Sequence, residues 1–386
     1  MMEFYGVIHP EYQEMRRLRS TKRTGYARYY AFPAILHADQ NRVLIAYKNG
    51  VNHGRDPQGT QVKLEQITLD IPSQRVTEET VVFDQTPYIP QMGEYVCMPN
   101  GDICLYVDMQ RIEESVNVRT GMEEIRSKDG GKTYLPSRRL VVVDGVEYGY
   151  PLNFCEKNGR VYMLAMTFPN LAGSKGRRQV HVISSADNGA SWRFEVNLTE
   201  KLSLEFNESA LLATQEGFAL FTRGESARHQ ENAGTDAEAP ACLVMLDDAF
   251  HPLRMRDYRH TRNDFSQVGR PRLYRYRDIL LLITRQHIHT NMGIRMALDL
   301  FAIEPRSLEI RARFRLNDPV AEEQDGHYAN LYLDETGKKP MLRVVDYLTC
   351  PTPANPTVKR KTDIVQMSFD VAELIRQAKE ETGCDF

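Results

Sequence analysis

The chain has 386 residues and a formal net charge of −3, because 49 lysine and arginine residues nearly balance 52 aspartate and glutamate residues. So small a net charge gives no overall field that would attract nucleic acid or an anionic membrane, and neither is expected as a partner. No run of about 18 apolar residues occurs, so no membrane-spanning helix is expected.

Residues 1–25 are expected to form an arm ahead of the main domain. They contain no apolar core behind basic residues, so the sequence predicts no secretory signal and a cytoplasmic protein. The six cysteines show no CxxC spacing, which favours free thiols in a reducing compartment and predicts no metal site. The run FYGVI at residues 4–8 is expected to supply a strand that completes the last sheet.

Two octapeptides in the middle of the chain are near copies of each other. They are SKDGGKTY, starting at Ser127, and SADNGASW, which starts at Ser185 and contains the only tryptophan. Serine and aspartate side chains bond nearby backbone N–H groups, and glycine adopts the backbone angles of a tight turn. Each copy therefore predicts a turn between antiparallel strands. Weaker copies end at Asp70, Asp247, Glu304 and Asp370. Together with the two octapeptides they recur about every 60 residues.

A second marker repeats in step with the first. Turn-type residues precede apolar runs near positions 41, 100, 158, 216, 277 and 336, again about 60 residues apart. Each repeat is consistent with four strands. Six repeats predict an all-β fold, a six-bladed β-propeller of four-stranded antiparallel blades over residues 26–370. The tail at 371–386 begins VAELIRQAKEE, which has the apolar spacing of a short C-terminal helix.

The first strand of each blade is expected to line the central channel, so equivalent residues near its start should meet at the channel mouth. These positions, about eight residues before each marker, hold Pro33, Met92, Tyr150, Glu208, Gly269 and Tyr328, with Arg270 beside the fifth. Glu208 and Tyr328 are the pair that suggests chemistry, because a carboxylate that takes the phenol proton makes tyrosine an oxygen nucleophile.

The two octapeptides resemble Asp-box motifs, also called bacterial neuraminidase repeats, and the chain resembles the sialidase-like six-bladed propellers. In that family a glutamate opens blade four and an arginine ends the next strand, and Glu208 in NESALL and Arg223 in FTR match them. A further family arginine is matched by Arg295 in GIRMAL, and the nucleophilic tyrosine by Tyr328 in GHYANLYL. The acid/base aspartate is matched by Asp56 in NGVNHGRDPQG.

One position departs from the family pattern. The family's first arginine precedes a proline in a pattern like Arg-Ile-Pro, whereas this chain has Ala31 ahead of Pro33, with Arg28 as a nearby substitute. Three arginines hold the carboxylate of sialic acid in the family. The resemblance therefore implies an anionic sugar as partner and leaves sialic acid itself open.

The resemblance implies exo-hydrolysis with retention of configuration, without cofactor or metal. The residues expected to hold the sugar and its carboxylate are Arg223, Arg295, Arg270, Arg28 and Tyr150. Tyr328 would attack the anomeric carbon as Glu208 takes its proton, and Asp56 would protonate the leaving oxygen and later activate water.

Two other classes of function stay open. A polysaccharide lyase acting on a uronic-acid chain would use His53 or Tyr328 to remove the proton beside a carboxylate held by arginines. A non-catalytic carbohydrate-binding propeller would need the pocket alone. Structural roles are open as well: Glu208 as the scaffold partner of Arg223, Tyr328 as a half-buried strand residue, and Asp56 as a turn residue.

Overall fold

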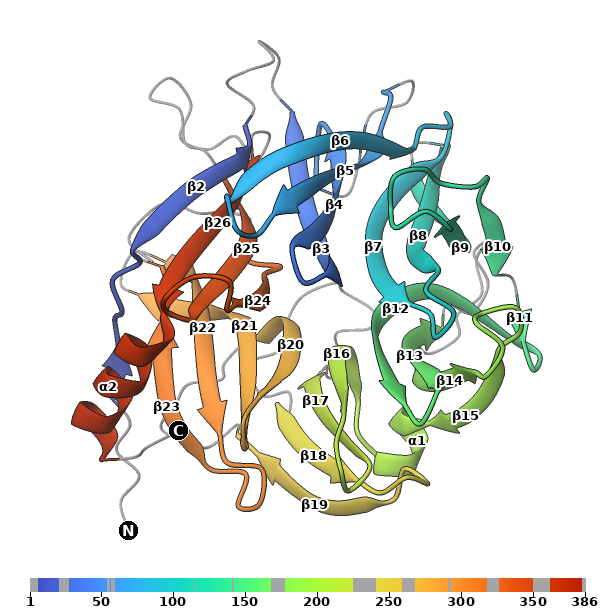
Figure 1. The fold of residues 1–386 in the computed structure, drawn as a ribbon. Helices are drawn as coiled ribbons and strands as arrows, with labels where there is room; N and C mark the ends of the chain where they lie inside the picture. The colour runs from blue at the N-terminus through green and yellow to red at the C-terminus, as the bar shows by residue number, and fades with distance from the viewer. Residues whose placement is uncertain are drawn as a thin grey trace. The chain divides into compact units, whose positions relative to one another are not determined.

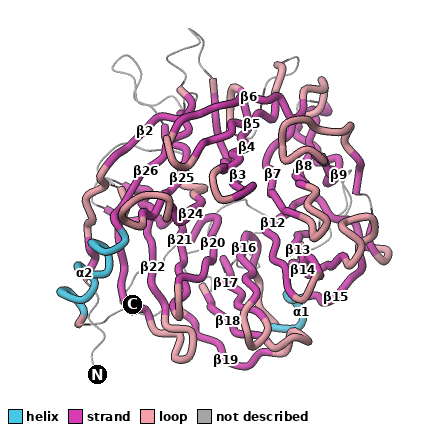
Figure 2. Tube along the Cα trace, viewed as in Figure 1, coloured by secondary structure: helices cyan, strands magenta, loops and turns pink. Residues whose placement is uncertain are grey.

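The computed structural model describes residues 6–20, 28–53, 56, 60–114, 116–140, 142–167, 178–224, 241–258, 268–290, 293–317, 326–349 and 362–383. They form strands β1 to β26 and two short helices, α1 and α2 (Figure 1; Figure 2). The expectation of an all-β chain with a short C-terminal helix is confirmed. The chain divides into two compact units, each described here by itself: an N-terminal unit (Leu18–Ser203 and Val358–Ile364) and a C-terminal unit (Met1–Arg17, Leu204–Thr357 and Val365–Phe386).

In the N-terminal unit the strands of each antiparallel sheet follow one another along the chain, which is the strand order of a propeller blade. The first group contains β3 (Tyr29–Asp39), β4 (Arg42–Gly50), β5 (Lys63–Asp70) and β6 (Arg75–Phe83). The second contains β7 (Ile89–Cys97), β8 (Ile103–Glu113), β9 (Val116–Ser127) and β10 (Arg138–Leu140). The third contains β11 (Val142–Val143), β12 (Val146–Lys157), β13 (Arg160–Thr167), β14 (Val180–Ser185) and β15 (Arg193–Asn197), which leads into α1 (Leu198–Leu202).

The C-terminal unit repeats this order. Its first sheet contains β16 (Phe206–Ala213), β17 (Phe218–Gly224), β18 (Cys242–Leu246) and β19 (Pro252–Asp257). The next contains β20 (Val268–Tyr276), β21 (Ile279–Thr290), β22 (Gly293–Ile303) and β23 (Ile310–Arg315). The last group contains β24 (Asn330–Asp334), β25 (Met341–Thr349) and β26 (Thr362–Asp370), which leads into α2 (Val371–Thr382).

The pairing of β26 changes the expected number of separate sheets. Its first residue, Thr362, pairs in parallel with Tyr29 of β3, and its hydroxyl donates a hydrogen bond of 2.5 Å to the carbonyl of Tyr30. The described strands therefore form five sheets rather than six. The four-strand repeat is present, but strand pairing does not confirm six separate blades.

The N-terminal arm contributes two strands, although not as expected. β1 (Val7–Ile8) pairs in parallel with β23, and β2 (Glu14–Arg19) pairs with β26. The expectation that the run at residues 4–8 completes the last sheet is thus wrong for its described strand residues. Ile8 packs instead in an apolar cluster with Phe314 of β23 and Ala378 of α2. So short an apolar run fits any edge with an apolar neighbour, and its sequence does not specify which.

Carboxylates close the turns at five of the six predicted repeat positions, and at the sixth Asp370 caps helix α2 instead of a turn between strands. Asp129 Oδ1 accepts hydrogen bonds from the backbone N–H groups of Lys132 (3.1 Å) and Thr133 (2.9 Å), and Asp187 Oδ1 accepts one from Ser191 (2.9 Å). The residues that accept backbone N–H bonds in the same way are Asp70, Asp247, Glu304 and Asp370. The local turn chemistry predicted from the repeat is therefore present in both units.

Apolar side chains fill the space between neighbouring sheets within each unit. In the C-terminal unit one cluster joins Phe221 of β17 with Phe301 of β22. In the N-terminal unit another joins Tyr106 of β8 with Met163 of β13, and Trp192 packs against it with its ring 5.6 Å from that of Tyr106. The aromatic residue that ends this octapeptide thus points inward.

The described cysteines are free thiols, namely Cys97, Cys104, Cys155 and Cys242. Among the described residues, neither helix has the length and apolar character that a membrane span requires. Helix α2 begins at a capped end, because Asp370 accepts bonds from the N–H groups of Ala372 and Glu373.

Acid is expected to destabilise the protein partly through the turn carboxylates. Hydrogen bonds from Ser191 lower the pKa of Asp187 to about 2, and bonds from Thr133 hold the pKa of Asp129 below its usual value. A carboxylate with a lowered pKa stabilises the folded chain above about pH 4, and this contribution is lost as the pH falls toward about 2. Thermal unfolding should therefore show Asp187→Asn less stable than the parent near neutrality, with the difference shrinking in acid. A difference that does not change with pH would contradict this.

Candidate active site

The first strands lose regular pairing at the positions that the repeat singled out. Register shifts fall between Ala31 and Ala34, Pro90 and Met92, Tyr148 and Tyr150, Phe206 and Ser209, and Gly269 and Arg272. The sixth position, Tyr328, follows His327, whose φ is +64°, just before β24. Bulges redirect side chains away from the regular ladder and are common next to active sites. The positions that the 60-residue repeat predicts to be equivalent therefore also lie at equivalent places in the structure.

Glu208 joins three strands of the C-terminal unit. Its Oε2 forms an ion pair with Nη1 of Arg223 on β17 and accepts a hydrogen bond of 3.3 Å from the backbone N–H of Arg270 on β20. Its own N–H donates to Asn207 Oδ1 at 2.6 Å. The Glu208 and Arg223 side chains are only 9% and 15% exposed, so little water weakens their attraction. The structure thus brings three of the predicted site residues together.

Buried arginines gather at the start of β20 and on the facing strand β21. They are Arg270, Arg272 and Arg285. Arg270 lies in the bulge with a φ of +43° and is 1% exposed. Burying a guanidinium group is costly unless it has hydrogen-bond or ionic partners. Arg295 is on β22, where its backbone pairs with Ile288, and its side chain lies outside the described part of the chain.

Tyr328 is buried beside Arg285, which the sequence analysis did not single out. The guanidinium carbon lies 5.0 Å from the centre of the Tyr328 ring, and Nη1 donates a hydrogen bond of 3.3 Å to the carbonyl of Gly326. Arg285 pairs across the sheet with Gly269, the residue before Arg270. Contacts therefore lead from Glu208 through this bulge to Tyr328, whereas direct contact of Glu208 with Tyr328 stays a prediction. A charged residue within the apolar strand ILLLITRQ was the signal that could have revealed Arg285.

A buried histidine–aspartate pair fixes the backbone just before Tyr328. His327 Nδ1 lies 2.6 Å from Asp346 Oδ2, and neither side chain is exposed. Asp346 Oδ1 also accepts a hydrogen bond of 2.8 Å from the N–H of Tyr347, whose ring centre lies 6.0 Å from that of Tyr328. These contacts hold the segment that leads into β24.

Asp56, the expected acid/base residue, is buried in the N-terminal unit. Its Oδ2 lies 2.5 Å from Nζ of Lys48, and both side chains are at most 1% exposed. Its Oδ1 accepts hydrogen bonds from the N–H groups of Val51 (2.7 Å) and Asn52 (3.2 Å). A Cβ at Gly50 would lie 2.7 Å from this oxygen, so glycine leaves room for the pair. These contacts stabilise the loop after β4, and the acid/base role stays a prediction.

His53 lies in the same loop, next to aromatic residues. Its Nδ1 is 2.9 Å from the hydroxyl of Tyr29, and its ring packs edge-on against Phe32 with centres 5.0 Å apart. Arg28, the proposed substitute for the arginine missing at Ala31, donates a hydrogen bond of 2.6 Å to Oδ1 of Asn49. That bond gives Arg28 a structural contact to β4, and its role in binding a sugar stays a prediction.

Tyr150 is buried in the bulge of β12 and leads to a carboxyl group that the sequence analysis missed. The guanidinium of Arg119 lies 5.5 Å from the centre of the Tyr150 ring, and its Nε donates to Asp108 Oδ2 at 3.0 Å. Burial raises the pKa of Asp108, and Arg119 opposes this shift. Asp108 is on a second strand, β8, opposite Met92 of the bulge in β7. The prediction from the repeat considered only residues near the start of first strands, so it could not include Asp108.

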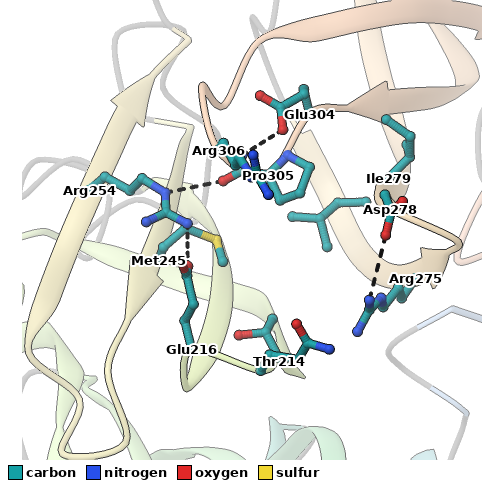
Figure 3. A pocket seen from close by; sticks show the side chains of 12 residues that line it. Thr214, Glu216, Met245, Arg254, Arg275, Asp278, Ile279, Glu304, Pro305 and Arg306 are labelled. Carbon is teal, nitrogen blue, oxygen red and sulfur yellow. Dashed lines mark hydrogen bonds and ion pairs between the residues drawn. The ribbon is translucent and has the colours of Figure 1, made fainter. Parts of the chain in front are cut away.

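A pocket of about 450 Å³ in the C-terminal unit lies at the turns, where β16 ends, rather than near Glu208 at its start (Figure 3). Arg254 crosses it, pairing with Glu216 and donating a hydrogen bond of 3.1 Å to the carbonyl of Pro305. None of the predicted site residues lines this pocket. A pocket of about 250 Å³ in the N-terminal unit is lined by Arg119, Tyr88 and Glu123, among others. Within the described ranges, no group of three or more His, Cys, Asp or Glu side chains is placed to hold a metal ion.

Comparison with solved structures finds the fold in other proteins. A Dyadobacter fermentans DSM 18053 protein of unknown function matches with a TM-score of 0.68 and 12% identity, over 93% of this chain and 98% of that one. Phage phi92 endosialidase matches with a TM-score of 0.62 and 8% identity, over 93% of this chain and 69% of that one. Trypanosoma rangeli sialidase in complex with sialic acid matches with 0.56 and 10%, over 98% of this chain and 60% of that one.

The likeness shows a shared fold. At these identities it extends no further, and this chain spans only about 60% of the length of the trypanosomal sialidase. Neither the protein-family models nor the curated proteins give a sequence match. The resemblance to sialidases seen in the sequence is therefore supported for the fold, while the chemistry depends on the residues themselves.

Proposed function

We propose that the protein is an exo-acting glycoside hydrolase of the sialidase-like type, which removes a terminal sugar bearing a carboxylate. The observation that carries the proposal is the arrangement in the C-terminal unit of Glu208 with Arg223, and of Tyr328 with Arg285, joined through the bulge at Arg270. A carboxylate, a tyrosine and several buried arginines are the groups that a tyrosine-based glycosidase for acidic sugars requires.

The proposal includes a six-bladed β-propeller with Asp-box turns. Three observations support it: the repeat of about 60 residues, the blade-like strand order within the sheets, and the fold likeness to sialidases. The five carboxylate-closed turns and the bulges in five first strands support the same local structure in successive repeats. A propeller would gather the bulges of its first strands around one axis.

In the proposed reaction Tyr328 Oη bonds to the anomeric carbon as the bond from that carbon to the leaving oxygen breaks. Glu208 takes the phenol proton, and an acidic side chain gives a proton to the leaving oxygen. Asp56 is the acid that the resemblance implies. Water then attacks the anomeric carbon as the bond from that carbon to Tyr328 Oη breaks. The water gives a proton to the deprotonated acid and Glu208 returns its proton to the Tyr328 oxygen, so two inversions give net retention.

The test is hydrolysis of umbelliferyl glycosides by the purified protein. Glycosides of sialic acid, a related keto-acid sugar and glucuronic acid are compared with a neutral galactoside as the matched control. We expect release of fluorescent umbelliferone from at least one acidic glycoside and none from the galactoside. Proton NMR of the first product should show the substrate's anomeric configuration. Binding of acidic sugars without release of umbelliferone from any of them would refute the hydrolase.

A lyase is the second candidate function, and the hydrogen bond between Tyr29 and His53 is the observation that favours it. A histidine oriented by a tyrosine can remove the proton beside a carboxylate. Incubation with uronic-acid polysaccharides distinguishes the two reactions. Elimination gives an unsaturated product that absorbs in the ultraviolet, whereas hydrolysis does not.

A further inference from the structure

We propose that Arg285 is a positioning residue for Tyr328 and that Gly269 is present to make room for it. Arg285 makes two contacts with the segment that carries the tyrosine. Its guanidinium carbon lies 5.0 Å from the centre of the Tyr328 ring, and Nη1 donates to the carbonyl of Gly326 at 3.3 Å. One contact restrains the ring and the other restrains the backbone two residues earlier.

The guanidinium reaches this position because of the residue across the sheet. Gly269 pairs directly with Arg285, and a Cβ at Gly269 would lie 2.5 Å from Nε, 2.7 Å from Nη2 and 2.9 Å from Cζ. No real side chain tolerates contacts this short, so any residue larger than glycine must displace the guanidinium. The φ of Gly269 is not in the left-handed region, so space rather than backbone conformation explains the glycine.

The ring of Tyr328 and the backbone before it are therefore held by different contacts. Arg285 lies over the ring, while the buried pair of His327 and Asp346 fixes the preceding backbone. A planar cation over an aromatic face is directional, because the ring's negative face attracts it. A nucleophile misplaced by about 1 Å loses about 100-fold in rate, so this restraint matters for attack on an anomeric carbon. The catalytic part of the inference rests on the proposed function.

The experiment compares Arg285→Met, Arg285→Lys and Gly269→Ala with the parent protein. Arg256→Met is the matched control, because Arg256 lies 5.8 Å from the ring centre of another buried tyrosine, Tyr258, in the same unit. Each protein is labelled with ¹³C in the tyrosine rings, and the signal of Tyr328 is assigned from its loss in Tyr328→Phe. Thermal unfolding shows that each variant is folded.

We expect Arg285→Met and Gly269→Ala to move the Tyr328 signal and to lower kcat about 10- to 100-fold with little change in KM. Arg285→Lys keeps the charge, so it should restore part of the parent's Tyr328 signal position and part of its kcat. Arg256→Met should leave the Tyr328 signal and kcat unchanged. If Arg285→Met fails to fold, Gly269→Ala still removes the contact. A folded Arg285→Met or Gly269→Ala variant with an unmoved Tyr328 signal overturns the inference. If the parent hydrolyses no glycoside, the proposed function fails, and the Tyr328 signal alone decides the positioning.

Discussion

Tyr328→Phe should lower kcat by at least about a thousand-fold on the acidic glycoside that the parent protein hydrolyses. The substitution removes one oxygen atom, the one that would bond to the anomeric carbon. The ring, and with it the contact to Arg285 at 5.0 Å, is kept, so sugar binding should change little. The measurement is kcat and KM by umbelliferone release, together with the dissociation constant for the free acidic sugar.

Tyr332→Phe is the control for this substitution. Tyr332 is a buried tyrosine of the neighbouring strand β24, and its hydroxyl donates a hydrogen bond of 3.0 Å to Oε1 of Gln366. Its loss is expected to cost about 1 kcal/mol of stability without affecting turnover. Activity of Tyr328→Phe within tenfold of the parent would remove Tyr328 as the nucleophile. Equal losses in both variants would point to a general weakening of the fold.

Asp56→Asn should destabilise the N-terminal unit by about 3–5 kcal/mol, because it removes the carboxylate that neutralises buried Lys48. The amide still has an oxygen to accept the bonds from Val51 and Asn52. The loss of stability therefore measures the effect of removing the charge. Urea unfolding of the parent and the variant measures the difference. A second change, Lys48→Met, should recover much of the loss, since replacing both charges leaves no ion to desolvate.

The control for Asp56 is the ion pair of Asp84 with Lys63, at 2.9 Å in the same unit. Its side chains are 29% and 26% exposed, so Asp84→Asn should cost no more than about 1 kcal/mol. A stable Asp56→Asn variant with strongly reduced kcat would instead identify Asp56 as the acid of the reaction. The two outcomes separate the structural role that the contacts favour from the catalytic role that the resemblance implies.

The sequence predicted the repeating parts of the structure well, because they depend on local chemistry. Asp129 and Asp187 close their turns with hydrogen bonds to residues only a few positions away. The bulges, such as that around Glu208, recur at a fixed distance from a turn marker. Such features need no knowledge of distant contacts, so one chain contains the information.

What the sequence did not predict depends on contacts across strands and sheets. Arg285 and Asp108 are on second strands, and their importance comes from contacts with residues on other strands, Tyr328 and Arg119. The place of Val7 in the C-terminal unit depends on the apolar edge offered by β23. To predict any of these contacts, the strand register would have to be known in advance. Register follows from the packed structure rather than from local residue preferences.

The pairing of Thr362 with Tyr29 has a consequence for synthesis on the ribosome. The hydroxyl of Thr362 bonds to a carbonyl that precedes it by 332 residues in the chain, so β3 is made long before its neighbour exists. Until β26 has been synthesised, that flank of the nascent sheet offers unpaired backbone groups to other strands. Chains released before β26 is made are therefore expected to aggregate through this flank.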